Sequence, residues 1–168
     1  MTLRIRSIQQ ADTTALLAFL NPEIEQRLYW YEHQPRTEAD QWARFEKLLA
    51  QHYPVWVAEV DGEAVGVGYL SAFRPQAGYA IAAEHSVYVH PKAQGQGIGK
   101  ALMQQLLDSA RALHIEQLVG VIDSENAPSI ALHQRLGFKL VGQLNHIARK
   151  HGQDRHATLW QKSLRELG

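Results

Sequence analysis

The chain has 168 residues, 45% of them apolar, and its 17 basic side chains are balanced by 17 acidic ones. This size is typical of one domain with its own core, and we expect a single domain over residues 1–168. A net charge of zero, without any basic cluster, excludes a general attraction to nucleic acid or anionic membranes, so we expect neither partner. The absence of cysteine excludes disulfides, thiolate metal sites and cysteine nucleophiles.

The expected location follows from what the sequence lacks. No apolar run approaches the roughly 18 residues of a membrane span. The opening segment MTLRIRSIQQ lacks the apolar core of a secretion signal. We therefore expect a cytoplasmic enzyme or binding protein.

The first half of the chain predicts two helices and four strands. A proline has no backbone N–H, so Pro22 is expected to end the first helix, and Thr37 is expected to cap the second. Asp61-Gly62 is typical of a tight hairpin turn. In chain order, the elements are a strand at 3–8, helices at 11–20 and 38–51, and strands at 55–60, 63–73 and 82–90.

The second half begins with a glycine-rich segment and alternates between helices and strands. Its elements are a helix from 98 to 113, a strand at 117–122, a helix from Asn126 to 136, and a closing hairpin of 138–150 and 155–164 around HGQD. Strands 82–90 and 117–122 are joined through a helix, so they should lie parallel with a right-handed crossover. The pattern predicts a mixed α/β sheet with helices on its faces.

The segment AQGQGIGKAL (93–102) has a glycine at every second position from 95 to 99. Glycines at the start of a helix let an anion approach unpaired N–H groups, which indicates a phosphate-bearing ligand, although an ordinary strand-to-helix turn is an equal alternative. A Walker loop would need a glycine at Gln94 and a hydroxyl at Ala101. The dinucleotide fingerprint needs the spacing G-x-G-x-x-G, which is absent here.

The residues from Gln94 to Gly99 resemble the pyrophosphate loop Q/R-x-x-G-x-G/A of the GCN5-related N-acetyltransferase (GNAT) superfamily. EHSVYVHP (84–91), ENAPSIALHQRLGF (125–138) and the late HGQD hairpin are similar to its phosphinothricin and methionine sulfoximine acetyltransferase branch. The resemblance implies one strongly twisted central sheet of about seven strands with helices on both faces. It also implies a split between the strands at 82–90 and 116–122, where acetyl-CoA binds.

The resemblance carries over to cofactor-binding positions. Main-chain amides of the glycine loop would hold the pyrophosphate, and the strand at the split would bind the pantetheine arm through its backbone. Asn126 would contact the cofactor from the facing helix, and it is also a helix cap. The implied residues are Val87, Tyr88, Val89, Gln94, Gly95, Gln96, Gly97, Ile98, Gly99, Lys100, Asn126 and Ser129.

Two residues are candidates for proton transfer. Glu84 lies in a largely apolar strand, and the resemblance implies that it is the general base that deprotonates the acceptor amine, directly or through water; an exposed strand-end carboxylate is the alternative. His133 occupies the helix position where many family members have a tyrosine, so it is the candidate general acid for the departing thiolate; a half-exposed surface histidine is the alternative. His85 should point to the opposite face of the strand from Glu84, and we expect a structural role for it.

The predicted activity is direct transfer of an acetyl group from acetyl-CoA to the primary amine of a small amino-acid-like acceptor. Phe73, Arg74, Tyr79 and Glu84 match acceptor-binding positions of the branch. Arg74 is suited to a carboxylate, and a solvated surface arginine is an equal alternative. Gln76, Ala80, Ile81 and Ala82 depart from the usual residues and put the herbicide phosphinothricin in doubt as the acceptor. The stretch at 21–35 also departs, and Tyr29, Trp30 and Tyr31 within it are either acceptor-pocket or core residues.

Two alternative functions stay open: acetylation of a peptide or protein N-terminus, and a non-catalytic acyl-CoA-binding module. The resemblance implies a homodimer, with the late hairpin as one candidate interface. The nine histidines include no H-E-x-x-H motif, and His146, His151 and His156 lie on the predicted hairpin without a carboxylate shell. We therefore expect no metal site.

Overall fold

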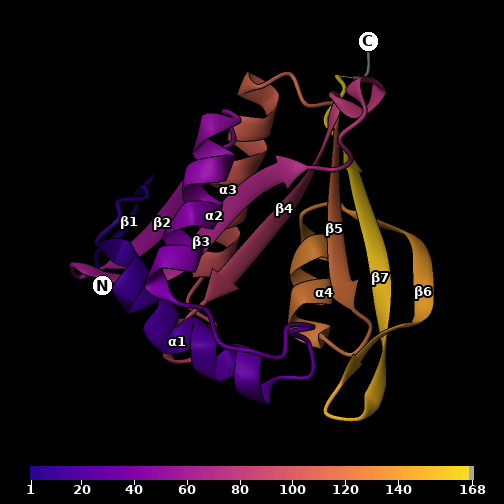
Figure 1. The fold of residues 1–168 in the computed structure, drawn as a ribbon. Helices are drawn as coiled ribbons and strands as arrows, with labels where there is room; N and C mark the ends of the chain where they lie inside the picture. The colour runs from indigo at the N-terminus through magenta and orange to yellow at the C-terminus, as the bar shows by residue number, and fades with distance from the viewer. Residues whose placement is uncertain (167–168) are drawn as a thin grey trace.

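A seven-stranded sheet and four α-helices make up the structure, a computed structural model that describes residues 1–166 (Figure 1). The strands lie in the order β1-β2-β3-β4-β5-β7-β6, and among neighbours only β4 and β5 run parallel. The bounds are β1 (Leu3–Ser7), α1 (Asp12–Gln26), α2 (Glu38–Ala50), β2 (Val55–Val60), β3 (Glu63–Ala72), β4 (Ala82–Val89), α3 (Ile98–Ala112), β5 (Gln117–Asp123), α4 (Ala127–Arg135), β6 (Lys139–Lys150) and β7 (Gln153–Ser163). The predicted mixed sheet is confirmed.

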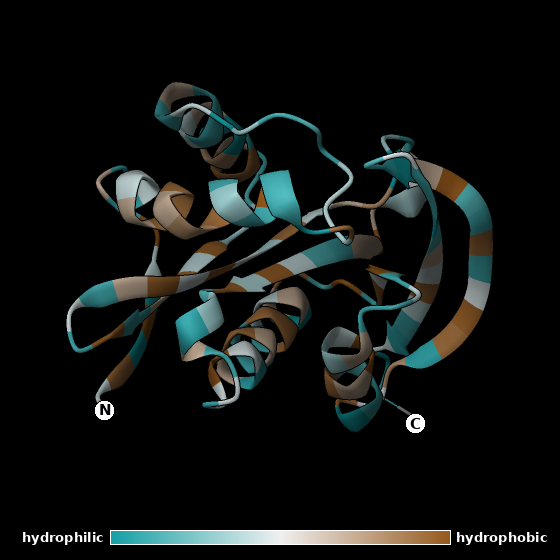
Figure 2. Cartoon of the chain, turned by 90° about the horizontal axis from the view of Figure 1, so that it is seen from below, coloured by the Kyte–Doolittle hydropathy of each residue, from teal (hydrophilic) through white to brown (hydrophobic). Residues whose placement is uncertain are grey.

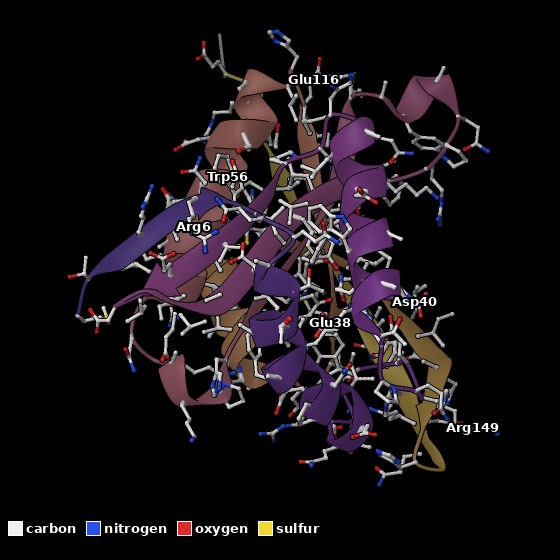
Figure 3. The ribbon with its side chains drawn as sticks, turned by 60° about the vertical axis from the view of Figure 1, so that its left-hand side comes forward. Arg6, Glu38, Asp40, Trp56, Glu116 and Arg149 are labelled. Atoms are coloured by element: carbon white, nitrogen blue, oxygen red, sulfur yellow. The ribbon has the colours of Figure 1, made fainter. Side chains whose placement is uncertain are left out.

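Helices cover both faces of the sheet. Figure 2 shows α1 and α2 on one side and α3 and α4 on the other, with apolar segments turned toward the strands. Leu16 and Phe45 pack with Val57 and Val67 on the first side. The α3 side is centred on a second cluster that includes Met103 and Leu106. Trp56 ties β2 to α3 by donating its indole N–H to Ser109 Oγ at 3.0 Å (Figure 3).

The sheet opens between β4 and β5. These strands pair only at Ala82/Gln117, Ala83/Leu118 and Glu84/Val119. Beyond Glu84, β4 stays paired with β3 and β5 stays paired with β7, so the two halves of the sheet diverge, with α4 beside the opening (Figure 1). The predicted split is confirmed, and its apex lies immediately after Glu84.

The first helix is longer than the sequence predicted. We expected it to end at Asn21-Pro22, but α1 runs through Pro22 to Gln26. Tertiary contacts compensate for the hydrogen bond that proline cannot donate. Ile24 is fully buried beyond the proline, and the Asn21 side chain exchanges two hydrogen bonds with the backbone of Arg36, at 2.8 and 2.9 Å.

Two smaller features complete the fold. The closing turn is tighter than the HGQD that we expected, because only His151 and Gly152, both with positive φ, lie between β6 and β7. Within residues 1–166, no helix is both long and apolar enough to cross a membrane.

Candidate active site

The edge of β4 that faces the split presents backbone groups. His90 donates its N–H to Val65 O at 2.8 Å, toward β3. Backbone groups of alternate residues point to alternate edges of an antiparallel strand, so Val89 and Val87 direct theirs into the split. The Val89 carbonyl accepts a hydrogen bond from the Gln94 side chain at 3.2 Å, which links this edge to the glycine loop.

The side chains of the same strand divide between the two faces of the sheet. Val87 and Val89 pack against the α3 side. Tyr88, which the sequence placed among the cofactor-binding residues, turns to the α1 side, where its ring stacks on Trp30 with centroids 4.3 Å apart. Its side chain therefore lies on the other face of the sheet, and its backbone pairs with Val67 of β3.

The glycine loop ends at the N-terminus of α3. Gly95 and Gly97 have φ angles of 76° and 81°, which favour glycine, and Gly97 is the N-cap residue. Gly99 has an ordinary φ, and a Cβ atom there would lie 3.5 Å from the Leu132 side chain, an unstrained contact. The first turn of α3 contains no acidic residue, and the first N–H groups of the helix have no carbonyl acceptor within the helix. The loop thus offers N–H groups and a partial positive charge to an anion.

Residues of α4 approach the apex of the split. The Asn126 side chain accepts a hydrogen bond from the Ser129 N–H at 3.4 Å, which confirms the predicted cap. His133 is 5% exposed, so the half-exposed alternative is wrong. Its Nδ1 lies 2.7 Å from the Ser129 carbonyl oxygen, and its Nε2 lies 2.7 Å from Nε2 of His85. Burial lowers the pKa of His133, although the Ser129 carbonyl opposes this.

Glu84 is the last residue of β4 that pairs with β5. It is half-buried, and within the described part of the chain its carboxylate forms no hydrogen bond or ion pair. Burial raises its pKa, and the nearby Arg74 guanidinium partly opposes this effect. A carboxylate with a raised pKa and no structural partner is suited to accept a proton.

A cavity of about 810 Å³ lies between α2, the end of β3 and the segment that follows β3. Ser71, which lines it, is the sheet partner of Glu84, so the cavity adjoins the candidate base. Its charged lining residues are Arg36, Arg44, Lys47 and Arg74, without an acidic side chain. Three predicted acceptor residues meet in one wall: Phe73 and Tyr79 pack edge to face at 5.6 Å, and Arg74 lies over the Phe73 ring at 5.2 Å.

The segment between α1 and α2 crosses the split. The Tyr29 hydroxyl donates to the Glu125 carbonyl at 3.0 Å, and the Tyr31 hydroxyl donates to Asp123. Buried Lys150 of β6 donates to the carbonyls of Ile24 and Glu32. We had expected acceptor-pocket or core roles for Tyr29, Trp30 and Tyr31. Trp30 packs against the core cluster on the α1 side, and the hydroxyls of Tyr29 and Tyr31 connect the two halves of the sheet.

Sequence reasoning missed two buried polar pairs. Arg155 of β7 binds Asp123 at the end of β5 with two hydrogen bonds, 2.7 and 3.0 Å long. A charged residue in each of two strands was the available signal, but only the fold brings the strands together. The other missed pair is His85 with His133. Among residues 1–166, no group of three or more histidine or acidic side chains is arranged to hold a metal ion.

Comparison with known proteins gives a consistent result. Residues 19–138 match the acetyltransferase (GNAT) family. The chain is 35% identical over 165 residues to an L-methionine sulfoximine/L-methionine sulfone acetyltransferase of Pseudomonas aeruginosa, covering 98% of this chain and 96% of the relative. A phosphinothricin acetyltransferase structure from Sinorhizobium meliloti, in complex with acetyl-CoA, superimposes with a TM-score of 0.93 at 34% identity over 98% of this chain and 89% of that one. A ribosomal-protein-alanine N-acetyltransferase structure from Brucella melitensis gives 0.93 at 35% identity over 96% and 99%.

Proposed function

The chain belongs to the acetyltransferase (GNAT) family, and from this premise we propose that it transfers the acetyl group of acetyl-CoA directly to the primary amine of a small amino-acid-like acceptor. One observation carries the choice of acceptor. The half-buried Glu84, whose carboxylate has no partner among residues 1–166, adjoins a cavity whose charged lining is entirely cationic and includes Arg74. A base for the amine beside a cation for the carboxylate matches the two ends of an amino acid.

The split and the glycine loop fit acetyl-CoA, which supplies an activated acyl group as its thioester. Amides from Gly95 to Lys100 are suited to the pyrophosphate. The backbone of Val87 and Val89 would pair with the amides of the pantetheine arm as a neighbouring strand would, and Asn126 and Ser129 would contact that arm from α4.

Glu84 takes the first proton. The acceptor arrives mostly as an ammonium ion, because an α-amino group has a pKa of about 8. Glu84 removes one proton, directly or through water, and the free amine forms the C–N bond with the acetyl carbon. The backbone N–H at Val87 would polarise the thioester carbonyl.

His133 handles the second proton. The new nitrogen carries one surplus proton, and the sulfur that leaves as the C–S bond breaks needs one. His133 is the proposed carrier of this proton from nitrogen to sulfur, and it acts as the general acid toward the departing thiolate.

The decisive experiment measures thiol release from acetyl-CoA with a panel of acceptors: free amino acids, methionine sulfoximine, phosphinothricin, polyamines and short peptides. We expect free amino-acid-like acceptors to react and polyamines to be inert. Glu84→Gln should lower kcat/KM by roughly 10²–10⁴-fold. A variant with full activity across the pH range would remove Glu84 as the base.

Peptide or protein N-terminal acetylation is the second candidate, favoured by the likeness to the Brucella melitensis enzyme. Arg74 counts against it, because a peptide's first residue has no free carboxylate. A peptide that reacts faster than its own first amino acid would favour this candidate. A non-catalytic acyl-CoA-binding module predicts cofactor binding without thiol release for any acceptor, and the unpaired Glu84 argues against that outcome.

The proposal extends to a cytoplasmic homodimer. β6 is an edge strand, and four large apolar side chains on it are 42–57% exposed: Leu140, Val141, Leu144 and Ile147. An exposed apolar edge strand is typical of an interface. A second copy of the chain is the partner that we propose for it.

A further inference from the structure

Aromatic side chains line much of the cavity beside Glu84. Tyr69 of β3 packs edge to face on Phe45 of α2, with ring centroids 6.0 Å apart. Phe73 and Tyr79 form a second pair of this kind in the wall that follows β3, with centroids 5.6 Å apart. The lining residues that carry a ring are Phe45, Tyr53, Tyr69, Phe73 and Tyr79.

The protein leaves part of this apolar surface uncovered. Tyr79 is 45% exposed, and the side chains of Tyr53, Tyr69 and Phe73 are only half-buried. A ring that serves the core alone is covered more completely, as Phe45 is at 1% exposure. Because burial of apolar surface is favourable, a ligand that covers these rings gains affinity.

The cavity is larger than the polar end of an amino acid requires. Its volume of about 810 Å³ lies in the range of roughly 300–1,000 Å³ that is typical of sites for drug-sized ligands. Ala72, Ala77 and Ala80 line it with methyl groups only, which leaves the space open. Ala80 and Gln76 are also positions at which the chain departs from the phosphinothricin branch. We therefore expect the acceptor to carry a large side chain.

The position of Arg74 orients the acceptor. The α-amine and the α-carboxylate are attached to the same carbon, so the cation that binds the carboxylate must lie near the base. Arg74 is near enough to Glu84 to oppose the effect of burial on the pKa of that carboxyl. Its guanidinium also lies 5.2 Å from the centre of the Phe73 ring. The carboxylate position therefore adjoins both the base and the rings.

The other cations of the lining do not call for a second anion. Glu32 binds Arg36 through contacts of 2.5 and 2.8 Å, and it binds Arg44 at 3.3 Å. Arg44 and Lys47 are exposed on α2, where water solvates their charges. The acceptor's carboxylate at Arg74 is then the one anion that the site requires, and the side chain of the acceptor needs no charge.

We propose that the acceptor is an α-amino acid with an aromatic side chain, whose ring packs against Phe73 and Tyr79 while its amine faces Glu84 and its carboxylate pairs with Arg74. This inference rests on the proposed acetyl transfer and adds the class of its substrate. Transfer forms the C–N bond and breaks the C–S bond. Of the two protons that the ammonium nitrogen loses, one leaves through Glu84 and the other ends on the sulfur of CoA. The products are an N-acetylated aromatic amino acid and free CoA.

A panel of acceptors tests the class of side chain. Thiol release from acetyl-CoA gives kcat/KM for L-phenylalanine, L-cyclohexylalanine, L-methionine sulfone and L-glutamate. Phenylalanine should exceed its saturated analogue by roughly 2–10-fold, because only an aromatic ring gains from edge-to-face packing. It should exceed the sulfone by about 10-fold or more, since the sulfone oxygens must leave water for an apolar lining. Equal values for phenylalanine and cyclohexylalanine, or a preference for the sulfone or glutamate, would overturn the inference.

Variants of the two exposed rings test where the acceptor's ring lies. Phe73→Leu and Tyr79→Leu each remove a ring but keep an apolar side chain. Each should lower the ratio of kcat/KM for phenylalanine to that for cyclohexylalanine by about twofold or more. Tyr79→Phe is the matched control, because it keeps the ring and should keep this ratio. Both acceptors are measured on the same preparation, so a loss of folded protein cancels. An unchanged ratio in both leucine variants would remove these rings from the acceptor site.

Two further outcomes separate failure of this inference from failure of the proposed function. If the sulfone reacts and phenylalanine does not, the aromatic class fails, and acetyl transfer to a free amino acid stands. If no free amino acid releases thiol, the proposed function fails, and this inference fails with it. L-Phenylalaninamide keeps the ring but lacks the carboxylate, and its kcat/KM should be about 10-fold lower or less. A value equal to that of phenylalanine would overturn the orientation set by Arg74.

Discussion

The Tyr31 hydroxyl donates a 2.7 Å hydrogen bond to Oδ2 of Asp123, 92 positions later in the chain. Asp123 ends β5, and Tyr31 lies between α1 and α2, so the bond spans the two halves of the split sheet. The same carboxylate accepts two hydrogen bonds from Arg155. The width of the open end is thus fixed by a polar contact rather than by strand pairing.

Removing the Tyr31 hydroxyl should loosen this connection. We expect Tyr31→Phe to lower the free energy of unfolding by about 1–2 kcal/mol, because the hydrogen bond is to a charged acceptor. Urea unfolding followed by circular dichroism would measure the change. Tyr29→Phe is the matched control, since its hydroxyl binds a neutral carbonyl near the surface and its loss should cost less. Equal costs for the two variants would contradict the special role of Asp123.

The Asp123–Arg155 pair should make the free energy of unfolding depend on pH in the acidic range. Burial opposes ionisation of Asp123, but hydrogen bonds from Arg155, the Glu125 N–H and Tyr31 outweigh it and hold the pKa below its usual 3.8. A depressed pKa contributes stability above the unfolded-state value, and this stability is lost as pH falls through the folded-state value. The free energy of unfolding should therefore drop below about pH 4.

Asp123→Asn tests the origin of that drop. It removes one of the two carboxylates that pair with the buried guanidinium of Arg155. Because Glu125 keeps its ion pair with Arg155, the cost at neutral pH should stay below the roughly 3–5 kcal/mol expected for a buried charge left without any partner. The remaining acid dependence should be shallower than in the wild type, with Asp12 and Glu32, whose pKa values are also lowered, supplying what is left. An acid dependence as steep as that of the wild type would assign the effect to those residues instead.

Arg74 should tune the pH profile of the reaction. Protonation of Glu84 would remove the proposed base, so kcat/KM should fall as pH drops through a pKa that burial holds above the usual 4.5. Arg74 opposes that rise, so Arg74→Gln should move the acid limb to higher pH and also raise the KM of a carboxylate-bearing acceptor. Lys47→Gln removes a charge from the same cavity and should leave the acid limb in place. Identical shifts in both variants would mean that the effect is only a general change in cavity charge.

The extent to which sequence predicted the site depended on how local each feature is. The glycine loop at 95–99 could be recognised from adjacent residues alone. Its glycine spacing and the residues around it indicated a turn that leads into a helix and a ligand that carries phosphate. Tyr31 and Asp123 are joined only after β5 is placed beside the α1–α2 segment. His85 was expected to be structural. The alternation of side chains along a strand shows on which face of the sheet His85 lies, but it does not show which side chain from another element contacts it there. The contact between His85 and His133 is possible only because Gly120 of β5 has no side chain, since a Cβ atom there would lie 2.8 Å from the His85 ring.

The glycine loop allows a comparison between two of its members. Gly97→Ala forces an alanine to a φ of 81°, which costs roughly 1–2 kcal/mol, and should weaken acetyl-CoA binding because the amides of the loop are displaced. Gly99→Ala meets only ordinary contacts at an ordinary φ and should leave both properties nearly unchanged. Isothermal titration calorimetry and thermal unfolding would measure both. Gly99→Ala could instead lower the affinity for acetyl-CoA strongly while the thermal midpoint is retained. That result would show that the cofactor lies against Gly99 and leaves no room for a Cβ atom.

The exposed edge strand β6 leads to the prediction about assembly. Val141 and Ile147 are 57% and 54% exposed on this edge, and a charge placed in an apolar interface must be desolvated without a partner. Val141→Asp and Ile147→Asp should therefore convert a dimer to monomers in light scattering coupled to size-exclusion chromatography. Leu113→Asp is the control, because Leu113 is an exposed apolar residue at the end of α3, away from β6. If all three variants remain dimeric, the interface lies elsewhere. If the wild type is itself monomeric at micromolar concentration, the apolar edge of β6 has no partner copy.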